Sequence, residues 1–262
     1  MARRAQIVGW GKCLPTTVMT NVELEQRVDS SDEWIRTRTG IVERRLAAPG
    51  ETTFSLALRA ALDAVEVADI NPARIDMVLV ATCTPDYGAF PSVASLVQHA
   101  IGATHAGAFD LNAACAGFAY GFAIASDMIT SGSHRTVLLI GAETMSRILD
   151  WTDRSTCVLF GDGAGAVVLQ ASEALGGVLS TVLGSDGAGA HLLFVPGDGS
   201  DVPPAEAAGT GRRRYVKMDG REVYRFAVNV TSRAAQEAVA KARLGLTDID
   251  LFIPHQANIR II

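Results

Sequence analysis

The chain has 262 residues, of which 48% are hydrophobic and 19% are charged, so it can bury a sizeable core and is not expected to be disordered. Its net charge of −5, with scattered basic residues, argues against a dedicated nucleic-acid binder. The longest apolar stretch, residues 116–126, is shorter than the roughly 18 residues of a membrane span. We therefore expect neither a nucleic acid nor a membrane as partner.

The cysteines and the N-terminal residues indicate the cellular compartment of the protein. The four cysteines form no CxxC pair, so neither a zinc site nor a disulfide framework is predicted. The first residues hold two arginines but no continuous apolar segment, which argues against a secretion signal. We expect a reduced, cytoplasmic protein without a bound metal.

Apolar runs alternate with helical patterns along the chain. Runs that are apolar at every position are typical of strands covered on both faces, which predicts an α/β protein with buried sheets. The helix pattern at 222–243 has one apolar stripe, whereas the pattern at 116–131 is apolar all round and predicts a wholly buried central helix. Strands are predicted at 77–81, 136–141, 156–160, 166–169, 178–183 and 251–253, and helices at 53–67, 91–101, 116–131 and 222–243.

A weak internal repeat predicts two similar halves. Two amphipathic helices lead into similar strands at Asp76 and Asp250, an offset of 174 residues. We expect the halves to be residues 1–172 and 173–262, joined by the turn at 172–177. The first half continues for 94 residues between Asp76 and Gln170, whereas 12 residues follow Asp250. The second half is thus expected to be incomplete, and the natural protein is expected to continue beyond Ile262.

Cys115 is the strongest candidate nucleophile. It stands in the segment NAACAGF, residues 112–118, at the start of the helix predicted to be buried. Small neighbours leave room for a ligand, and the partial positive charge of a helix N-terminus favours a thiolate, as an acyl-accepting nucleophile requires. The alternative is a cysteine packed as a small core residue. For Cys13, Cys83 and Cys157, in or beside apolar runs, the core role is predicted.

His255 is the second candidate. It follows the run 251–253 in the segment PHQAN, residues 254–258. Ligand-facing residues of α/β proteins gather beyond the carboxyl ends of strands, and histidine handles protons near neutral pH. A structural histidine is the alternative, with about even weight.

Two further segments are assigned no chemistry. Residues 161–166, GDGAGA, fit a dinucleotide fingerprint formally, but a strand and not a helix is predicted to follow them. A tight hairpin, or a close approach of the backbone to the active centre, is the favoured interpretation. The run Arg212–Arg214 is expected in a solvated loop, although it could meet an acidic partner.

Five motifs together resemble a known family. They are SDEWIRTRTGI at 31–41, AACAGF at 113–118, TDR at 152–154, FGDGAGA at 160–166 and PHQAN at 254–258. From residue 7 to residue 262 the chain closely resembles beta-ketoacyl-[acyl carrier protein] synthase III, a condensing enzyme of the thiolase superfamily that starts bacterial fatty-acid synthesis. The resemblance implies a five-layer αβαβα fold of two duplicated halves, a homodimer and no cofactor.

The resemblance also implies ping-pong chemistry with acyl-CoA and the acyl carrier protein as partners. Cys115 takes the acyl group, with its own backbone N–H as one oxyanion donor. His255 then stabilises the enolate formed when malonyl-carrier protein loses CO₂. The asparagine partner of His255 and the second oxyanion donor of the family would lie beyond Ile262.

The other site residues implied by the resemblance bind substrates. Trp34 and Arg154 would sandwich the adenine of CoA, and Arg38 and Thr39 would approach its phosphates. Phe90 would close the acyl pocket of the neighbouring protomer, and Arg260 would face the carrier protein. The pantetheine tunnel would be lined by Gly220, Tyr224, Ala257 and Ile261. Arg221 departs from the family pattern, in which a smaller polar residue often follows the tunnel glycine.

Two alternatives stay open. The chain could be an acyltransferase of the same fold that delivers the Cys115-bound acyl group to a hydroxyl or an amine, although His255 favours condensation. It could also be a catalytically impaired partner in a dimer, which would not form an acyl-thioester. The preferred acyl chain cannot be deduced from the sequence.

Overall fold

A computed structural model of the chain describes residues 3–174, 176–196 and 215–262. The contacts divide it into two units. Unit 1 comprises Met1–Thr17, Arg45–Thr144 and Asp162–Leu183, and unit 2 comprises Val18–Arg44, Met145–Gly161 and Gly184–Ile262. These units group residues by contact and do not test a duplication, so the division at residue 172 stays a prediction.

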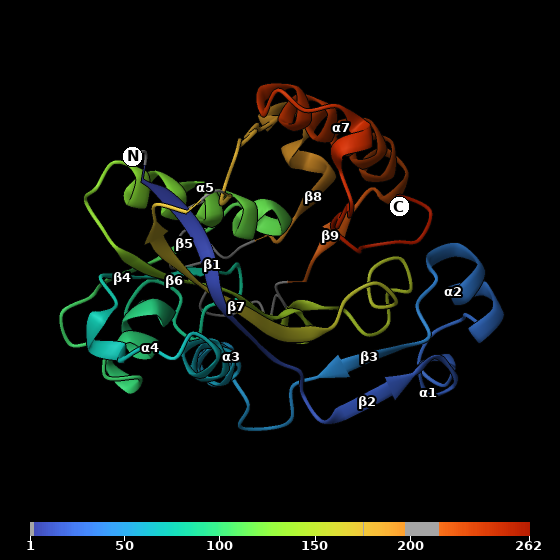
Figure 1. The fold of residues 1–262 in the computed structure, drawn as a ribbon. Coiled ribbons are helices and arrows are strands. Elements are labelled where there is room, and N and C mark those ends of the chain that lie inside the picture. Colours follow the sequence, from blue (N-terminus) through green and yellow to red (C-terminus); the bar gives the residue numbers. More distant parts are fainter. Residues whose placement is uncertain (1–2, 175, 197–214) are drawn as a thin grey trace. The chain divides into compact units, whose positions relative to one another are not determined.

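Unit 1 is built on a five-stranded mixed sheet (Figure 1). The inner pairs β4 with β5 and β4 with β6 are parallel, whereas β7 runs antiparallel to both β6 and β1. The register of β4 and β6 pairs Ala81 with Gly141. The sheet order is β1 (Arg4–Cys13), β7 (Asp162–Ser172), β6 (Thr136–Thr144), β4 (Met77–Ala81) and β5 (Gly107–Leu111).

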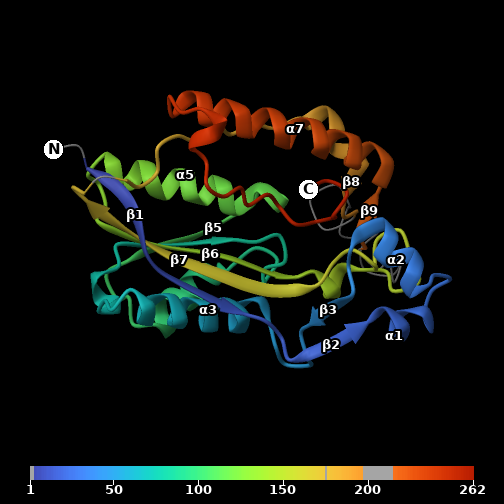
Figure 2. The same cartoon turned by 45° about the vertical axis from the view of Figure 1, so that its right-hand side comes forward.

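Helices cover both faces of this sheet. Helices α3 (Thr53–Val67) and α4 (Val93–Ala100) lie on one face and α5 (Gly117–Thr130) on the other (Figure 2). Successive side chains of a strand point to opposite faces, and β6 obeys this rule: Leu138 and Ile140 join the α3 and α4 core, while Leu139 joins the α5 core. Continuous apolar runs are therefore required in the inner strands.

Local signals fix the helix starts. Thr52 caps α3 by accepting from the Ser55 N–H, and Asp219 accepts from the Arg221 and Glu222 N–H groups at the start of α7 (Gly220–Lys241). The Asp110 carboxylate accepts from the first two N–H groups of α4, at 2.8 and 2.7 Å, which joins β5 to that helix.

Unit 2 holds short elements around α2 (Asp32–Thr39) and α7. β2 (Thr17–Thr20) pairs with β3 (Glu43–Leu46), β8 (Leu193–Phe194) pairs with β9 (Lys217–Met218), and α1 (Asn21–Glu25) precedes α2. Single 3₁₀ turns complete the two units: η1 (Pro72–Arg74), η2 (Ala114–Ala116), η3 (Met145–Ile148), η4 (Gly187–Leu192) and η5 (Leu246–Asp248).

The predicted helices and inner strands are confirmed. α3 and β4 have the predicted bounds, and α4, α5 and α7 differ from prediction by one or two residues at their ends. β6 and β7 contain the predicted runs 136–141 and 166–169. The sequence analysis missed β1 and β5, as well as the short elements of unit 2. The predicted run Arg212–Arg214 lies outside the described residues.

Three predicted strands are wrong. Residues 156–160 form turns that bury Cys157 and Val158, so the apolar run serves packing without a strand. Residues 178–183 and 251–253 are irregular, and Leu251 and Ile253 are 72% and 74% exposed. In each case no neighbouring strand pairs with the run in the described part of the chain, and a run without a pairing partner is not a strand.

Two further expectations need correction. α5 is not wholly buried: it buries one face through its small residues, while Phe118 is 39% exposed. The glycine segment at 161–166 makes no hairpin, because Gly163 and Gly165 lie inside β7. A strand follows the glycines, as predicted, so the helix that a dinucleotide fingerprint requires is not found there.

Candidate active site

Cys115 lies on the 3₁₀ turn η2, between the end of β5 and the start of α5, and is exposed. Ala114 has a φ of 47°, a left-handed conformation that costs an alanine energy. The Asn112 side chain supports the turn by accepting from the Ala114 N–H at 3.1 Å. A Cβ on Gly117 would lie 3.1 Å from that of Ala81, so α5 starts in close contact with β4. Small residues thus allow the turn that presents the thiol.

The expected lowering of the Cys115 pKa is not found. Desolvation by the surrounding protein raises the pKa of this thiol, and the negative charge of Glu143 raises it further, whereas a backbone hydrogen bond lowers it. The free thiol is neutral at neutral pH.

Glu143 is a residue that the sequence analysis missed. It lies near the end of β6, and its carboxylate accepts from the Cys83 N–H at 2.8 Å, the Cys83 thiol at 3.2 Å and the Thr82 and Thr84 hydroxyls. Thr84 also accepts from the Thr144 N–H at 2.9 Å, which ties the segment after β4 to the end of β6. The sequence feature that could have indicated Glu143 is an acidic residue near the end of a strand that is otherwise mostly apolar.

The remaining cysteines differ from one another. Cys13 and Cys157 are buried, which confirms their predicted core role. Cys83 is only partly buried and hydrogen-bonded, so a pure core role is wrong for it. Burial and the adjacent Glu143 raise the pKa of Cys83 to about 12.

Unit 2 brings three of the predicted site residues together around one indole ring. The guanidinium carbons of Arg38 and Arg154 lie 4.8 and 5.4 Å from the centre of the Trp34 ring. Arg154 also donates to the Asp29 carbonyl at 2.6 Å, with the Asp29 carboxylate 3.5 Å away. Segments more than 100 residues apart in sequence therefore form one cationic aromatic platform.

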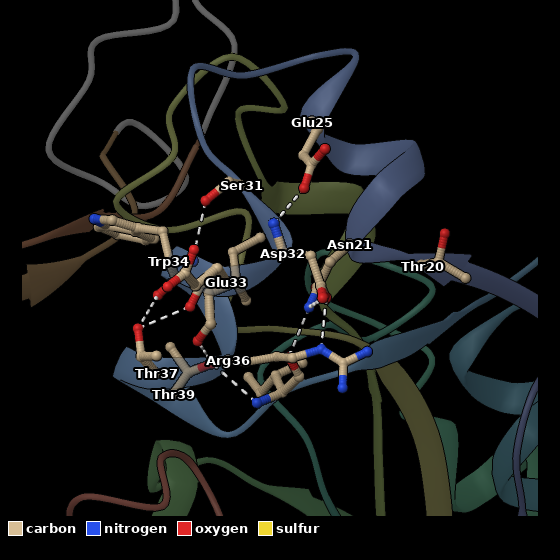
Figure 3. Close-up of polar contacts among 12 residues, drawn as sticks. Thr20, Asn21, Glu25, Ser31, Asp32, Glu33, Trp34, Arg36, Thr37 and Thr39 are labelled. Carbon is tan, nitrogen blue, oxygen red and sulfur yellow. Dashed lines mark hydrogen bonds and ion pairs between the residues drawn. The ribbon is translucent and has the colours of Figure 1, made fainter.

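The platform rests on a well-anchored α2 (Figure 3). The Ser31 hydroxyl accepts from the Trp34 N–H at 3.1 Å, which caps the helix, and the helix ends at Gly40 with a φ of 78°. The Asp32 carboxylate accepts from Arg36 at 2.7 Å and from the Asn21 amide at 2.8 Å (Figure 3). These contacts orient the face of α2 that carries Trp34.

Thr39 is buried and its hydroxyl is engaged within the chain. It donates to the Ile35 carbonyl at 2.7 Å and accepts from the Ile41 N–H at 3.0 Å. The Thr39 carbonyl accepts a hydrogen bond from the Ile259 N–H at 2.9 Å. A Cβ added to Gly40 would lie 2.8 Å from the Cβ of Ile259, so the glycine is needed for this close approach. The close approach to Gly40 thus holds the segment after His255 beside α2.

The predicted tunnel residues are only partly brought together. The Tyr224 hydroxyl donates to the Arg260 carbonyl at 3.1 Å, and the Arg260 guanidinium lies 5.9 Å from the Tyr224 ring centre. Gly220 opens α7, whereas His255, Ala257 and Ile261 lie in the irregular segment that follows residue 250. Cys115 and Phe90 belong to unit 1, and the other predicted site residues belong to unit 2.

The described residues of each unit border a hollow. A cavity of about 170 Å³ in unit 1 is bounded by Thr82, by the segment from Pro85 to Pro91, and by residues 110–112, just before η2. A hollow of about 410 Å³ in unit 2 follows one face of α7 from Arg221 to Asn229. Within the described residues, no group of three or more histidine, cysteine or acidic side chains is placed to hold a metal ion.

Known proteins that are similar to this chain give one answer. The profile of the family described as 3-oxoacyl-[acyl-carrier-protein (ACP)] synthase III matches residues 109–187. A beta-ketoacyl-[acyl-carrier-protein] synthase III of Alkalilimnicola ehrlichii is 53% identical over 260 residues, covering 98% of this chain and 79% of the relative. That of Caldanaerobacter subterraneus is 48% identical over 258 residues, covering 98% and 78%.

Solved structures agree. The crystal structure of 3-oxoacyl-[acyl-carrier-protein] synthase III from Aquifex aeolicus superposes with a TM-score of 0.90 at 44% identity, covering 98% of this chain and 78% of that one. The chain belongs to the beta-ketoacyl-[acyl-carrier-protein] synthase III family. Membership confirms the predicted thiolase-like α/β fold and the predicted condensing-enzyme, acyltransferase activity in fatty-acid synthesis.

Members of the beta-ketoacyl-[acyl-carrier-protein] synthase III family use acyl-CoA and the acyl carrier protein as substrates. None of the helices described in this family member has both the length and the apolar character of a bilayer span.

Proposed function

We propose that this family member forms an acyl-thioester on Cys115 from acyl-CoA and condenses it with malonyl-carrier protein. The observation that carries the proposal is the exposed Cys115 on the strained turn before α5, inside the motif that the family resemblance assigns to the nucleophile. An exposed thiol at a helix start can be reached by a bulky thioester, and the backbone N–H of Cys115 is proposed as one oxyanion donor.

The first half-reaction balances without an external base. The Cys115 sulfur adds to the thioester carbonyl, the bond from carbonyl carbon to CoA sulfur breaks, and the thiol proton leaves on the CoA thiol. A neutral Cys115, as its raised pKa indicates, is compatible with this step, because the proton need only transfer to the departing sulfur.

In the second half-reaction the malonyl carboxylate leaves as CO₂ and the electron pair remains on the adjacent carbon. That carbon attacks the acyl-Cys115 carbonyl, the bond from the carbonyl carbon to the Cys115 sulfur breaks, and the sulfur departs as a thiolate that takes up one proton from solvent. His255 is proposed to stabilise the intermediate enolate oxygen through a hydrogen bond. The exposure of His255 fits a residue that meets a substrate.

The adenine of CoA is proposed to bind between Trp34 and Arg154. Two stacked contacts of about 3.5 Å each require about 7 Å between the ring and the guanidinium, whereas the present separation is 5.4 Å. Arg154 is 49% exposed and attached mainly to a backbone carbonyl, so it can move outward by the missing distance of roughly 1.6 Å, estimated from that stacking spacing. Arg38 would then meet the phosphates from the platform edge, with Thr39 behind it.

The pantetheine arm and the carrier protein are proposed to use the other end of unit 2. Tyr224, which contacts Arg260, supports a route along the start of α7. Arg260 would attract the acidic carrier protein, and Arg221 borders the hollow of about 410 Å³ along α7. The tunnel lining is proposed to comprise Gly220, Tyr224, Ala257 and Ile261.

We also propose that the protein is a homodimer. A homodimer is supported by Phe90, which is 84% exposed, because a large aromatic side chain in such a position is typical of an interface. We further propose that the reaction needs no cofactor and takes place in the cytoplasm.

Mass spectrometry of the acylated protein tests the proposal. Incubation with acetyl-CoA should add one acetyl group to the peptide that carries Cys115, and C115A should lose the adduct. C83A is the matched control and should keep it. H255A should acylate but not condense with malonyl-carrier protein. An adduct on another residue would refute the assignment, transfer to a hydroxyl or amine would indicate the related acyltransferase, and no adduct would indicate an idle dimer partner.

A further inference from the structure

A buried arginine in unit 2 joins segments that are distant in the sequence. Arg44 of β3 is 5% exposed. Its Nη1 donates to the Met19 carbonyl at 3.2 Å, and its Nη2 donates to the Asn21 side-chain oxygen at 2.8 Å and to the Val158 carbonyl at 3.3 Å. No carboxylate pairs with Arg44 in the part of the chain that the structure describes, and its Nε has no hydrogen-bond partner there. A buried charge without a counter-charge costs free energy, which marks Arg44 as a position with a role beyond filling space.

Asn21 connects Arg44 to both ends of α2. The Asn21 side chain is buried, and its nitrogen donates to the Asp32 carboxylate at 2.8 Å (Figure 3) and to the Ile41 carbonyl at 2.8 Å. Asp32 is the first residue of α2, and Ile41 follows the glycine that ends this helix. The oxygen of the same amide accepts from Arg44. One buried amide therefore holds the helix that carries Trp34 at its two ends.

The third contact of Arg44 reaches the turn that carries Arg154. The Cys157 N–H donates to the Asp153 carbonyl at 3.0 Å, and the turn that this bond closes contains Arg154. Val158, the next residue, is buried, and its carbonyl accepts from Arg44. Arg44 thus anchors the turn whose arginine lies over the Trp34 ring.

The rigid guanidinium of Arg44 sets the spacing of these two segments. Its donors lie in one plane with fixed directions, and a single nitrogen, Nη2, binds both the Asn21 oxygen and the Val158 carbonyl. The 5.4 Å between the Trp34 ring centre and the Arg154 guanidinium depends on how far apart the two segments are held. A side chain that bonds to both segments therefore limits the separation of the two sides of the proposed adenine site.

We propose that Arg44 is a positioning residue that, together with Asn21, holds α2 and the Arg154 turn at the spacing which selects thioesters bearing the adenine nucleotide part of CoA. This inference rests on the proposed function, because it assumes that adenine binds between Trp34 and Arg154. Preorganised binding groups lose less freedom on binding, and a small displacement of such a group lowers a rate by a large factor. The effect should therefore fall on thioesters that reach the platform.

Acetylation by two donors tests the inference. Acetyl-CoA carries the adenine nucleotide, whereas acetyl-pantetheine presents the same thioester without it. The full chain is incubated with each donor, the second-order rate of acetylation is followed by mass spectrometry of the Cys115 peptide, and the ratio of the two rates is the selectivity. R44M keeps the apolar stem and removes the guanidinium. Its selectivity should fall about three- to tenfold, which is part of the contribution of one stacked base.

The selectivity separates positioning from a general loss of structure. A variant that is only less stable loses rate with both donors, so the ratio keeps its wild-type value. R45M is the matched control: it removes the neighbouring arginine of β3, whose guanidinium donates to the Pro15 carbonyl within unit 1 at 3.4 Å, and should keep the selectivity within twofold. N21S breaks the link to α2 but leaves Arg44 its two carbonyl acceptors, and should lower the selectivity as R44M does.

The outcomes distinguish this inference from the proposed function when W34A is measured in parallel. A loss of selectivity in W34A, but none in an R44M protein with wild-type circular dichroism, would overturn the inference alone. If R44M does not fold, N21S decides in the same way. An unchanged selectivity in W34A would refute adenine binding on Trp34, and with it the proposed function at this site. If Cys115 is not acetylated, the proposed nucleophile is wrong, and calorimetry with CoA decides the inference: the Kd should rise about three- to tenfold in R44M and stay within twofold in R45M.

Discussion

Replacing Trp34 with alanine should weaken CoA binding by a predictable amount. Stacking of a base on an aromatic side chain contributes about 1–3 kcal/mol. Insertion of adenine separates Arg154 from the ring and gives up a cation–π contact of about 0.5–1 kcal/mol at an exposed site. With the middle of each range, the net gain of about 1.25 kcal/mol corresponds to a Kd for CoA that rises about eightfold in W34A. Isothermal titration calorimetry with CoA measures this directly.

Trp151 provides the matched control for Trp34. The guanidinium carbon of Arg27 lies 5.9 Å from the centre of the Trp151 ring, but Trp151 is not part of the proposed CoA platform. W151A should therefore leave the Kd for CoA within twofold of wild type, and both variants should alkylate at Cys115 at the wild-type rate. An unchanged Kd in W34A, or an equal loss in W151A, would refute adenine stacking on Trp34.

Two further predictions concern stability. G11A should destabilise the fold by about 1–3 kcal/mol, because a Cβ at residue 11 would lie 2.2 Å from the Ala60 carbonyl oxygen and push β1 away from α3. Urea unfolding measures this loss. G187A is the control and should show no such loss, because its Cβ would meet nothing within 4 Å. Melting temperature should also fall as pH rises above 9: burial raises the pKa of Cys83 to about 12 and that of Cys157 to about 11 from 9.0, so the unfolded chain loses protons first. A melting temperature that stays constant from pH 8 to pH 11 would contradict this.

The predicted elements succeeded where local signals and packing agree. α3 matches its prediction because Thr52 caps it and its small residues bury one face. β4 matches because it is apolar at nearly every position and lies inside the sheet. β1 was missed because Gly9 and Gly11 interrupt its apolar pattern, and those glycines are explained only by the approach of α3. Such a contact between distant segments leaves no local mark.

The candidate site shows the same division. Cys115 could be selected from its small neighbours and its place before a helix, but its raised pKa comes from desolvation and then from Glu143, which belongs to another strand. The clustering of Trp34 with Arg154 rests on a contact between segments 120 positions apart. Only the family resemblance, and not spacing or periodicity, pointed to that pair.

The side chains of β6 differ in polarity between its two faces, and this difference affects how reliably β6 adopts its native register in the sheet. Glu143 is directed to the α5 face, while Ala142 belongs to the apolar core beneath α3 and α4. A slip of β6 by one residue against its neighbours would exchange the two faces. The carboxylate would then enter the apolar core without its four donors, at a cost of several kcal/mol. Glu143 therefore also penalises a wrongly paired sheet, because a chain in that register would bury this charge without its hydrogen-bond donors.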